Sequence, residues 1–238
     1  MSAPEDFGRA LRRRRRSSAR RRIVLVVGGA LFAVLAAVAI YLLWFSSVFV
    51  VDRVDVSGTR LLSLEEVTAA AEVPLGTPLA SIDPDQIAAR VASLDAVSAV
   101  SVTREFPDAV AIAVTERTVS YSRTSDDGYQ WVDAEGVIFH HTAEAASEVP
   151  IATTSGTDQR LLADVATVVR YLPEAVRQRL VSIEAVAVDK IELKLDDGDL
   201  AVWGSADDSE LKAAVLEKLL SVDASVYDVS APSYPTTK

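Results

Sequence analysis

The chain has 238 residues, half of them hydrophobic, so it is long enough for one or two domains with a substantial buried core. It contains no cysteine, which excludes disulfides, thiolate metal sites and cysteine nucleophiles. The formal net charge of −10 is unevenly distributed: nine of the 24 basic and two of the 34 acidic residues lie in residues 1–22, giving +7 there and −17 in the rest. The two parts are expected to have different roles.

Residues 23–45 form an uncharged apolar run that ends in Tyr41, Trp44 and Phe45. As a helix the run would span about 34 Å, enough to cross a hydrocarbon core of about 30 Å. The basic tail before it predicts a cytoplasmic N-terminus, with the bulk of the chain outside the membrane. The arginines that carry this prediction are Arg12, Arg13, Arg14, Arg15, Arg16, Arg20, Arg21 and Arg22. The alternatives are a cleaved signal peptide, which would have a shorter apolar region, and a tail that binds nucleic acid.

The segment after the apolar run predicts the order strand, helix, helix, strand, strand. Alternating valines indicate a strand near residues 50–56. A capping box at Ser63 and an Asp83-Pro84 cap each begin a helix. Branched apolar residues at alternate positions then predict two strands, around residues 100–105 and 110–117, separated by a turn at residues 106–108.

The rest of the chain is expected to be mostly strand. A hairpin is predicted at residues 129–139, and strands at 120–122, 181–188, 190–195, 200–203 and 226–230. A helix is predicted at 159–172 from its apolar stripe, and another at 209–220, capped at Asp208 or Ser209.

The element order and several motifs resemble the FtsQ/DivIB family of bacterial cell-division proteins and its POTRA domain. The resemblance is carried by "VSGTRLLSLEEV", by "VTREFP" followed by "VAIAVTER", and by "VWGSADDSELKAAVLEKLL" near the end. The positions that match the POTRA signature are Arg104, Phe106, Pro107, Glu116 and Arg117. The resemblance covers about residues 20–236.

The resulting fold class is α+β: a single N-terminal transmembrane helix, a βααββ POTRA domain, and a mixed, mostly antiparallel β domain with flanking helices. The expected divisions are a cytoplasmic Arg-rich tail at residues 1–22, the transmembrane helix at 23–45, the POTRA domain at 48–117 and the C-terminal β domain at 118–236.

The sequence contains no recognisable catalytic motif, so we expect a non-enzymatic protein without cofactors. His140 and His141 are adjacent on a predicted strand and would point to opposite faces, which makes them a poor metal pair. The Asp-Asp-Gly triplets at residues 126–128 and 196–198 are typical of hairpin turns, with a calcium loop as the weaker alternative.

The last predicted strand is the candidate partner-binding segment. If it lies at a sheet edge, an incoming strand could pair with it; the alternative is an interior strand that closes the core. The resemblance implies that this region binds FtsB, in a complex with FtsL, and the matching residues are Val226, Tyr227, Asp228, Val229, Ser230, Ala231 and Pro232.

The resemblance implies a scaffold of the bacterial divisome that helps control septal peptidoglycan synthesis. It would be a single-pass protein of the cell membrane at the division septum, and its POTRA domain could contact other septal proteins. No nucleic acid or small-molecule substrate is expected. A POTRA-bearing envelope transport or secretion component is the alternative.

Overall fold

The computed structural model describes residues 25–38, 41 and 47–238. Residues 25–38 are helical, and their apolar side chains are exposed, as in Leu25 and Phe32 at 67% and 75%. Among the described residues, no helix has both the length and the hydropathy needed to cross a membrane. The predicted span at residues 23–45 and the arginines before it lie partly or wholly outside the described residues.

The described chain forms two compact units, and the boundary between them passes through a three-stranded sheet. The first unit contains the described residues up to Ser57 together with Leu64–Arg90 and Ser101–Ala113. The second contains Gly58–Ser63, Val91–Val100 and Val114–Lys238.

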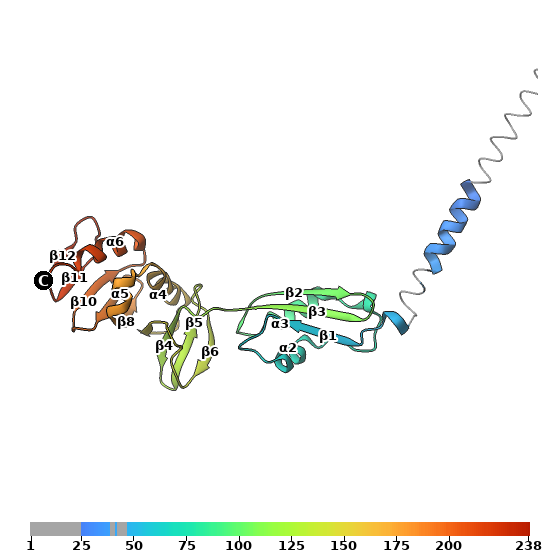
Figure 1. Cartoon of the computed structure of the whole chain (residues 1–238), viewed down its shortest axis with the longest axis horizontal. Helices are drawn as coiled ribbons and strands as arrows, with labels where there is room; N and C mark the ends of the chain where they lie inside the picture. Colours follow the sequence, from blue (N-terminus) through green and yellow to red (C-terminus); the bar gives the residue numbers. More distant parts are fainter. Residues whose placement is uncertain (1–24, 39–40, 42–46) are drawn as a thin grey trace, which may run out of the picture. The chain divides into compact units, whose positions relative to one another are not determined.

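The first sheet has the strand order β1-β3-β2, and two helices accompany it (Figure 1). Its elements in chain order are η1 (Ser47–Phe49), β1 (Arg53–Ser57), α2 (Leu64–Ala71), η2 (Leu79–Ser81), α3 (Pro84–Val91), β2 (Val97–Glu105) and β3 (Ala109–Glu116). β1 pairs with β3 in parallel. The predicted βααββ order is confirmed, with the short η2 added between the helices.

Local sequence explains both helices of this part. Val67 and Ala71 are four residues apart on α2 and are both fully buried, as the apolar spacing predicts. α3 begins after Asp83, whose carboxylate accepts hydrogen bonds from the backbone N–H groups of Asp85 and Gln86.

The turn after β1 requires glycine. Gly58 has a φ of +87°, and a Cβ atom at this position would lie 2.0 Å from the carbonyl oxygen of Val114. Only a residue without a side chain allows the chain to pass so close to the end of β3.

The second sheet has nine strands in the order β12-β11-β10-β9-β8-β7-β4-β5-β6. Its strands are β4 (Tyr121–Ser125), β5 (Gly128–Val132), β6 (Ile138–Thr142), β7 (Ile151–Thr154), β8 (Leu180–Ala187), β9 (Lys190–Leu195), β10 (Leu200–Gly204), β11 (Val226–Asp228) and β12 (Thr236–Thr237). Five of its strand pairs are antiparallel and three are parallel, so the predicted mixed, mostly antiparallel sheet is confirmed.

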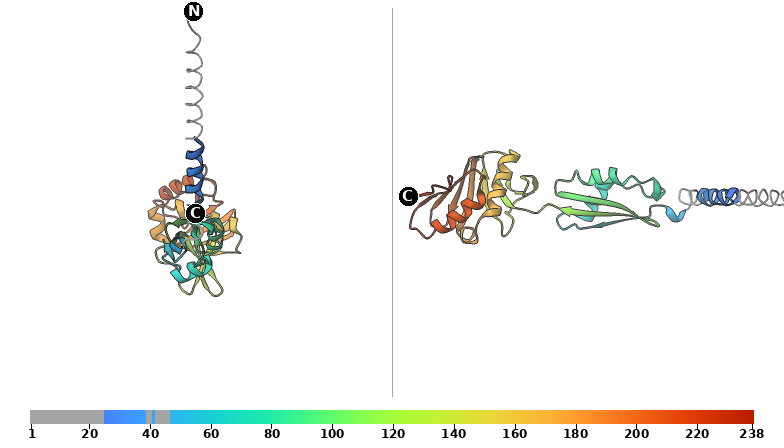
Figure 2. Two further views of the ribbon diagram at one scale, coloured as in Figure 1. Left: turned by 90° about the vertical axis from the view of Figure 1, so that its right-hand side faces the viewer. Right: turned by 90° about the horizontal axis from the view of Figure 1, so that it is seen from above.

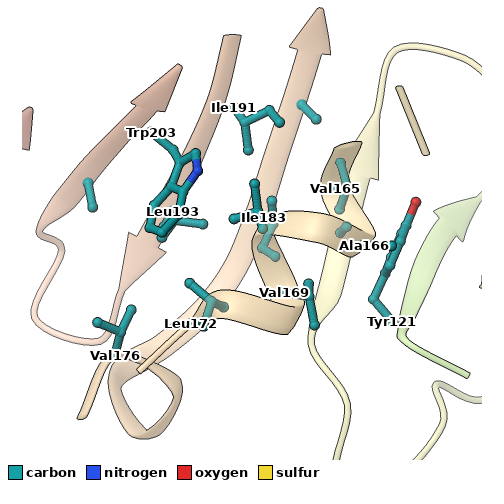
Figure 3. Close-up of a cluster of buried hydrophobic side chains, with 14 of the residues drawn as sticks. Tyr121, Val165, Ala166, Val169, Leu172, Val176, Ile183, Ile191, Leu193 and Trp203 are labelled. Carbon is teal, nitrogen blue, oxygen red and sulfur yellow. The ribbon is translucent and has the colours of Figure 1, made fainter. Parts of the chain in front are cut away.

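Helices α4 (Gln159–Tyr171) and α6 (Ser209–Leu219) pack on one face of this sheet, and the short α5 (Glu174–Arg179) follows α4 (Figure 2). The apolar stripe of α4 meets strand residues such as Ile183 and Leu193 in a single core (Figure 3). Trp203 lies in this core and is fully buried, and its indole N–H donates to Ser209 Oγ at 3.1 Å. The core therefore joins β10 to the start of α6.

Candidate partner-binding surface

Strand β11, which contains the first residues of the predicted binding segment, has a neighbouring strand on each side. It pairs in parallel with β10 and antiparallel with β12. Tyr227 is 2% exposed and its hydroxyl donates to the carbonyl oxygen of Val222, while Val229 is fully buried and its N–H donates to Val202 O. Of the two alternatives that the sequence left open, the interior strand is the one that the structure contains.

β12 is consequently the outermost strand at this end of the sheet. The backbone N–H groups of Val226 and Lys238 each donate to the carbonyl oxygen of the other residue, at 3.0 Å. Hydrogen-bonded and non-hydrogen-bonded pairs alternate along an antiparallel ladder, and the next pair is Tyr227 with Thr237. The N–H and C=O of Thr237 therefore point away from β11, toward the open edge of the sheet.

The turn between β11 and β12 is held by a few local hydrogen bonds. Asp228 accepts from the N–H and the hydroxyl of Ser230, and Tyr234 N–H donates to Ala231 O. Tyr234 itself is 84% exposed. An exposed tyrosine next to an open strand edge is a typical anchor for a protein partner.

The sequence-predicted segment thus divides into two groups. Tyr227 and Val229 support the core, whereas Ser230 and Ala231 are exposed. Val226, Asp228 and Pro232 are half-buried. The sequence analysis did not identify Tyr234 and Thr237, because the prolines at 232 and 235 suggested that strand pairing ended before them. The aromatic residue in "APSYP" was the one feature that could have indicated a contact surface there.

The POTRA signature residues Arg104 and Arg117 have structural contacts. The Nε and one terminal nitrogen of Arg104 donate to the carbonyl oxygen of Ile82, just before α3. Arg117 donates to the carbonyl oxygen of Asp95 and forms an ion pair with the buried carboxylate of Asp133.

Glu116 binds three consecutive backbone N–H groups. Its carboxylate accepts from Arg60, Leu61 and Leu62 at 2.8–3.0 Å. Partial burial opposes ionisation, but these three hydrogen bonds outweigh it and hold the pKa of Glu116 below its usual range. The charge of Glu116 therefore fixes the loop that follows β1.

The other two signature residues lie in the turn between β2 and β3. Phe106 is 59% exposed, and its ring meets the ring of Phe49 edge to face, with centroids 6.1 Å apart. Pro107 follows Phe106 through a cis peptide bond.

A buried lysine in the first turn of α6 contacts the loop between β10 and α6. Lys212 is 2% exposed and its ammonium donates to the carbonyl oxygen of Ser205 at 2.8 Å. Burial lowers the pKa of Lys212, opposed by the nearby carboxylates of Asp207 and Asp208. Ser209 Oγ donates to Ala206 O in the same loop, so this part of the "WGSADDSELK" motif has a structural role.

The acidic turn between β9 and β10 is paired with an arginine at the end of α5. The guanidinium of Arg179 pairs with Asp196, Asp197 and Asp199 at 3.0–3.2 Å, where a calcium ion would have to bind. The two histidines contact different groups: the ring of His140 lies 4.7 Å from that of Trp131, and His141 is hydrogen-bonded to Gln130. Within the described ranges, no group of three potential ligands could hold a metal ion.

A unit with the βααββ order, followed by a domain built on a mixed β-sheet, defines a POTRA-bearing protein. Comparison with known families agrees with this class. The profile of the POTRA domain, FtsQ-type, matches residues 49–117, and that of the cell division protein FtsQ/DivIB C-terminal domain matches residues 121–230.

Curated relatives make the assignment specific. The chain is 37% identical to cell division protein FtsQ of Streptomyces bingchenggensis, over 85% of this chain and 81% of that protein. It is 35% identical to the FtsQ of Streptomyces collinus, over 87% and 85%, and 36% identical to the FtsQ of Mycolicibacterium smegmatis, over 88% and 63%. The chain belongs to the FtsQ/DivIB family of cell division proteins.

A solved structure is more distantly similar. The major extracytoplasmic domain of the cell division protein DivIB from Geobacillus stearothermophilus aligns with 46% of this chain and 96% of its own length, at 16% identity and a TM-score of 0.36.

Proposed function

We propose that this protein is a non-enzymatic scaffold of the bacterial divisome that binds partners of the FtsB and FtsL type by strand addition. Through these partners it helps control septal peptidoglycan synthesis. Membership of the FtsQ/DivIB family supports the role in division. The observation that carries the mechanism is the outward-facing backbone of Thr237 on β12.

Strand addition suits this edge for a physical reason. An unpaired edge offers main-chain hydrogen bonds that give affinity, while nearby side chains set the register. The exposed Tyr234 and the exposed Ser230 and Ala231 lie in the turn beside that edge and would contact the incoming strand or its flanks. The buried side chains of Tyr227 and Val229 would keep β11 in place beside β12 in the sheet.

The proposed topology places residues 23–45 in the cell membrane and residues 1–22 in the cytoplasm, with the POTRA and β domains outside. The charge of +7 in residues 1–22 supports this orientation. Other septal proteins could bind the POTRA part, where β1 and β2 are the outer strands of the three-stranded sheet.

Imaging of a full-length chain with an N-terminal fluorescent protein in dividing cells tests this role. A band at the septum, accompanied by filamentous or branched cells when the protein is depleted, is the expected result. A uniform envelope signal in growing cells would contradict the divisome role and would favour an envelope transport component.

A further inference from the structure

An exposed apolar cluster lies at the end of the three-stranded sheet where the chain enters it. It consists of Val48, Phe49, Leu75 and Phe106, named here the apolar tip. Val48, Leu75 and Phe106 are 58%, 61% and 59% exposed. These residues come from three separate segments of the chain, and the rings of Phe49 and Phe106 are in contact.

Backbone hydrogen bonds hold the three segments together. The N–H of Gly76 donates to Val51 O and the N–H of Val51 donates to Thr77 O, both at 2.9 Å, which fixes the Leu75 loop beside residues 49–51. The N–H of Asp52 donates to Asp108 O at 2.9 Å, which fixes the Phe106 turn on the same segment. Figures 1 and 2 both show this turn at the same end of the sheet as η1.

We propose that the apolar tip is a membrane contact, which inserts into the interfacial layer of the bilayer that residues 23–45 cross. This inference rests on the proposed membrane anchor. Only Ser46 and Ser47 separate Phe45 from Val48. Three Cα–Cα steps of 3.8 Å reach at most about 11 Å, so the tip cannot leave the neighbourhood of the membrane surface.

The chemistry of the tip fits lipid. Phenylalanine and leucine side chains bind the boundary between headgroups and acyl chains by burying apolar area there, at a depth of about 5–10 Å. The charged residues next to the tip in sequence include Asp52, Glu105 and Asp108 against Arg53 and Arg104, and Arg53 pairs with Asp108 at 3.3 Å. This surrounding charge is negative overall, so the contact is apolar and does not depend on anionic lipid or low salt.

A second contact beside the anchor restricts the tilt of the first unit over the bilayer. One tether at residue 47 would leave the unit free to swivel, whereas insertion of Leu75 and Phe106 adds points of attachment on two other segments. A partner that is itself anchored in the membrane then meets a binding surface with less orientational freedom to lose on association.

The cysteine-free sequence allows a direct test on the full chain. The variant Leu75→Cys, labelled with a fluorophore and reconstituted in phosphatidylcholine vesicles, reports contact with lipids that carry a quencher near the headgroup. The matched control is Leu64→Cys, because Leu64 is 53% exposed and lies beyond the opposite end of β1. The variant Phe32→Cys reports the anchor through lipids quenched near the bilayer centre.

The expected result is quenching at residues 32 and 75 but not at 64, unchanged at high salt and reduced at residue 75 by Phe106→Ser. Quenching at 32 with equal, weak signals at 75 and 64 would overturn the membrane contact and leave the anchor standing. A blue-shifted but unquenched label at 75 would show that protein covers the tip, which also overturns it. No quenching at residue 32 would overturn the anchor and the tip together.

Discussion

Removal of the Glu116 carboxylate should release the loop that follows β1. The carboxylate accepts all three hydrogen bonds from Arg60, Leu61 and Leu62, and the amides of Leu61 and Leu62 are part-buried. In Glu116→Ala these donors lose their acceptor, and water replaces it only in part. In Glu116→Gln one oxygen remains but the negative charge is lost.

The size of the effect follows from the kind of hydrogen bond. A bond to a charged group contributes about 1.5–3 kcal/mol and a neutral one about 1 kcal/mol. Because the site is partly exposed, we expect Glu116→Ala to cost about 2–3 kcal/mol locally and Glu116→Gln about 1 kcal/mol. At 1.36 kcal/mol per factor of ten, the equilibrium constant for opening of the loop should rise about 30- to 150-fold in Glu116→Ala and about five-fold in Glu116→Gln.

Hydrogen–deuterium exchange of the full chain measures this opening at the affected amides. The peptide that contains Arg60 to Leu62 should exchange faster by these factors in the two variants. Glu105→Ala, at the opposite end of β2, removes the same charge and serves as the control.

The pH dependence gives an independent check. The pKa of Glu116 is depressed below its ordinary value of 4.5, so its stabilising effect is present above that value and is lost as the pH falls through the folded-state pKa. The difference between the parent chain and Glu116→Gln should therefore vanish in acid. Equal protection of the loop in the parent chain and Glu116→Ala at neutral pH would show that the carboxylate does not hold the loop.

Three further predictions concern the second unit and are measured by urea unfolding. Tyr227→Phe should lower the free energy of unfolding by about 1 kcal/mol, through loss of the hydrogen bond to Val222 O. Tyr227→Ala should lower it by about 3–5 kcal/mol, through the cavity that the missing ring leaves. Equal losses in the two variants would contradict the larger contribution assigned to the packing of the ring. Arg179→Met should cost about 1 kcal/mol at low salt, because the three aspartates of the β9–β10 turn then repel one another, and a loss that persists unchanged in 1 M salt would argue against this cause. Gly136→Ala should cost about 3 kcal/mol or more, because φ is +77° and the added Cβ would lie 2.4 Å from Gln159 O; a stable variant would show that α4 can shift.

Much of the three-stranded part could be predicted from the sequence because its signals are local. The cap at Asp83 and the apolar spacing of α2 are determined within a few neighbouring residues, and both agree with the structure. The predicted cap of α6 was only partly right: Asp208 precedes the helix, but it has a φ of +54° and makes no side-chain cap hydrogen bond.

Short elements whose partners are distant in sequence could not be predicted. β7, at Ile151–Thr154, has four residues and lies between β4 and β8, both in parallel pairs. α5 has only six residues and begins after Pro173. Neither is long enough for a periodic pattern, and only the packing of the whole sheet defines them.

The candidate site depends on the same kind of non-local pairing. The alternation of Tyr227 and Val229 with polar residues predicts a strand, but it does not say whether another strand lies beyond it. Residues 236–238 form that further strand by pairing with β11. They come after two prolines, in a segment whose sequence has no strand pattern. The proposed binding edge is therefore on β12 and not on β11.

Strand addition at β12 is tested by the affinity of full-length Thr237→Pro for the extracytoplasmic part of an FtsB-type partner. Proline removes the outward N–H of Thr237 and none that faces β11, so the sheet is retained while the incoming strand loses a donor. Thr237→Val is the matched control, because it keeps the N–H and the branched side chain. We expect Thr237→Pro to weaken binding by about ten-fold or more, at unchanged unfolding free energy, and Thr237→Val to bind like the parent chain. Equal affinities for Thr237→Pro and Thr237→Val would contradict strand addition at this edge.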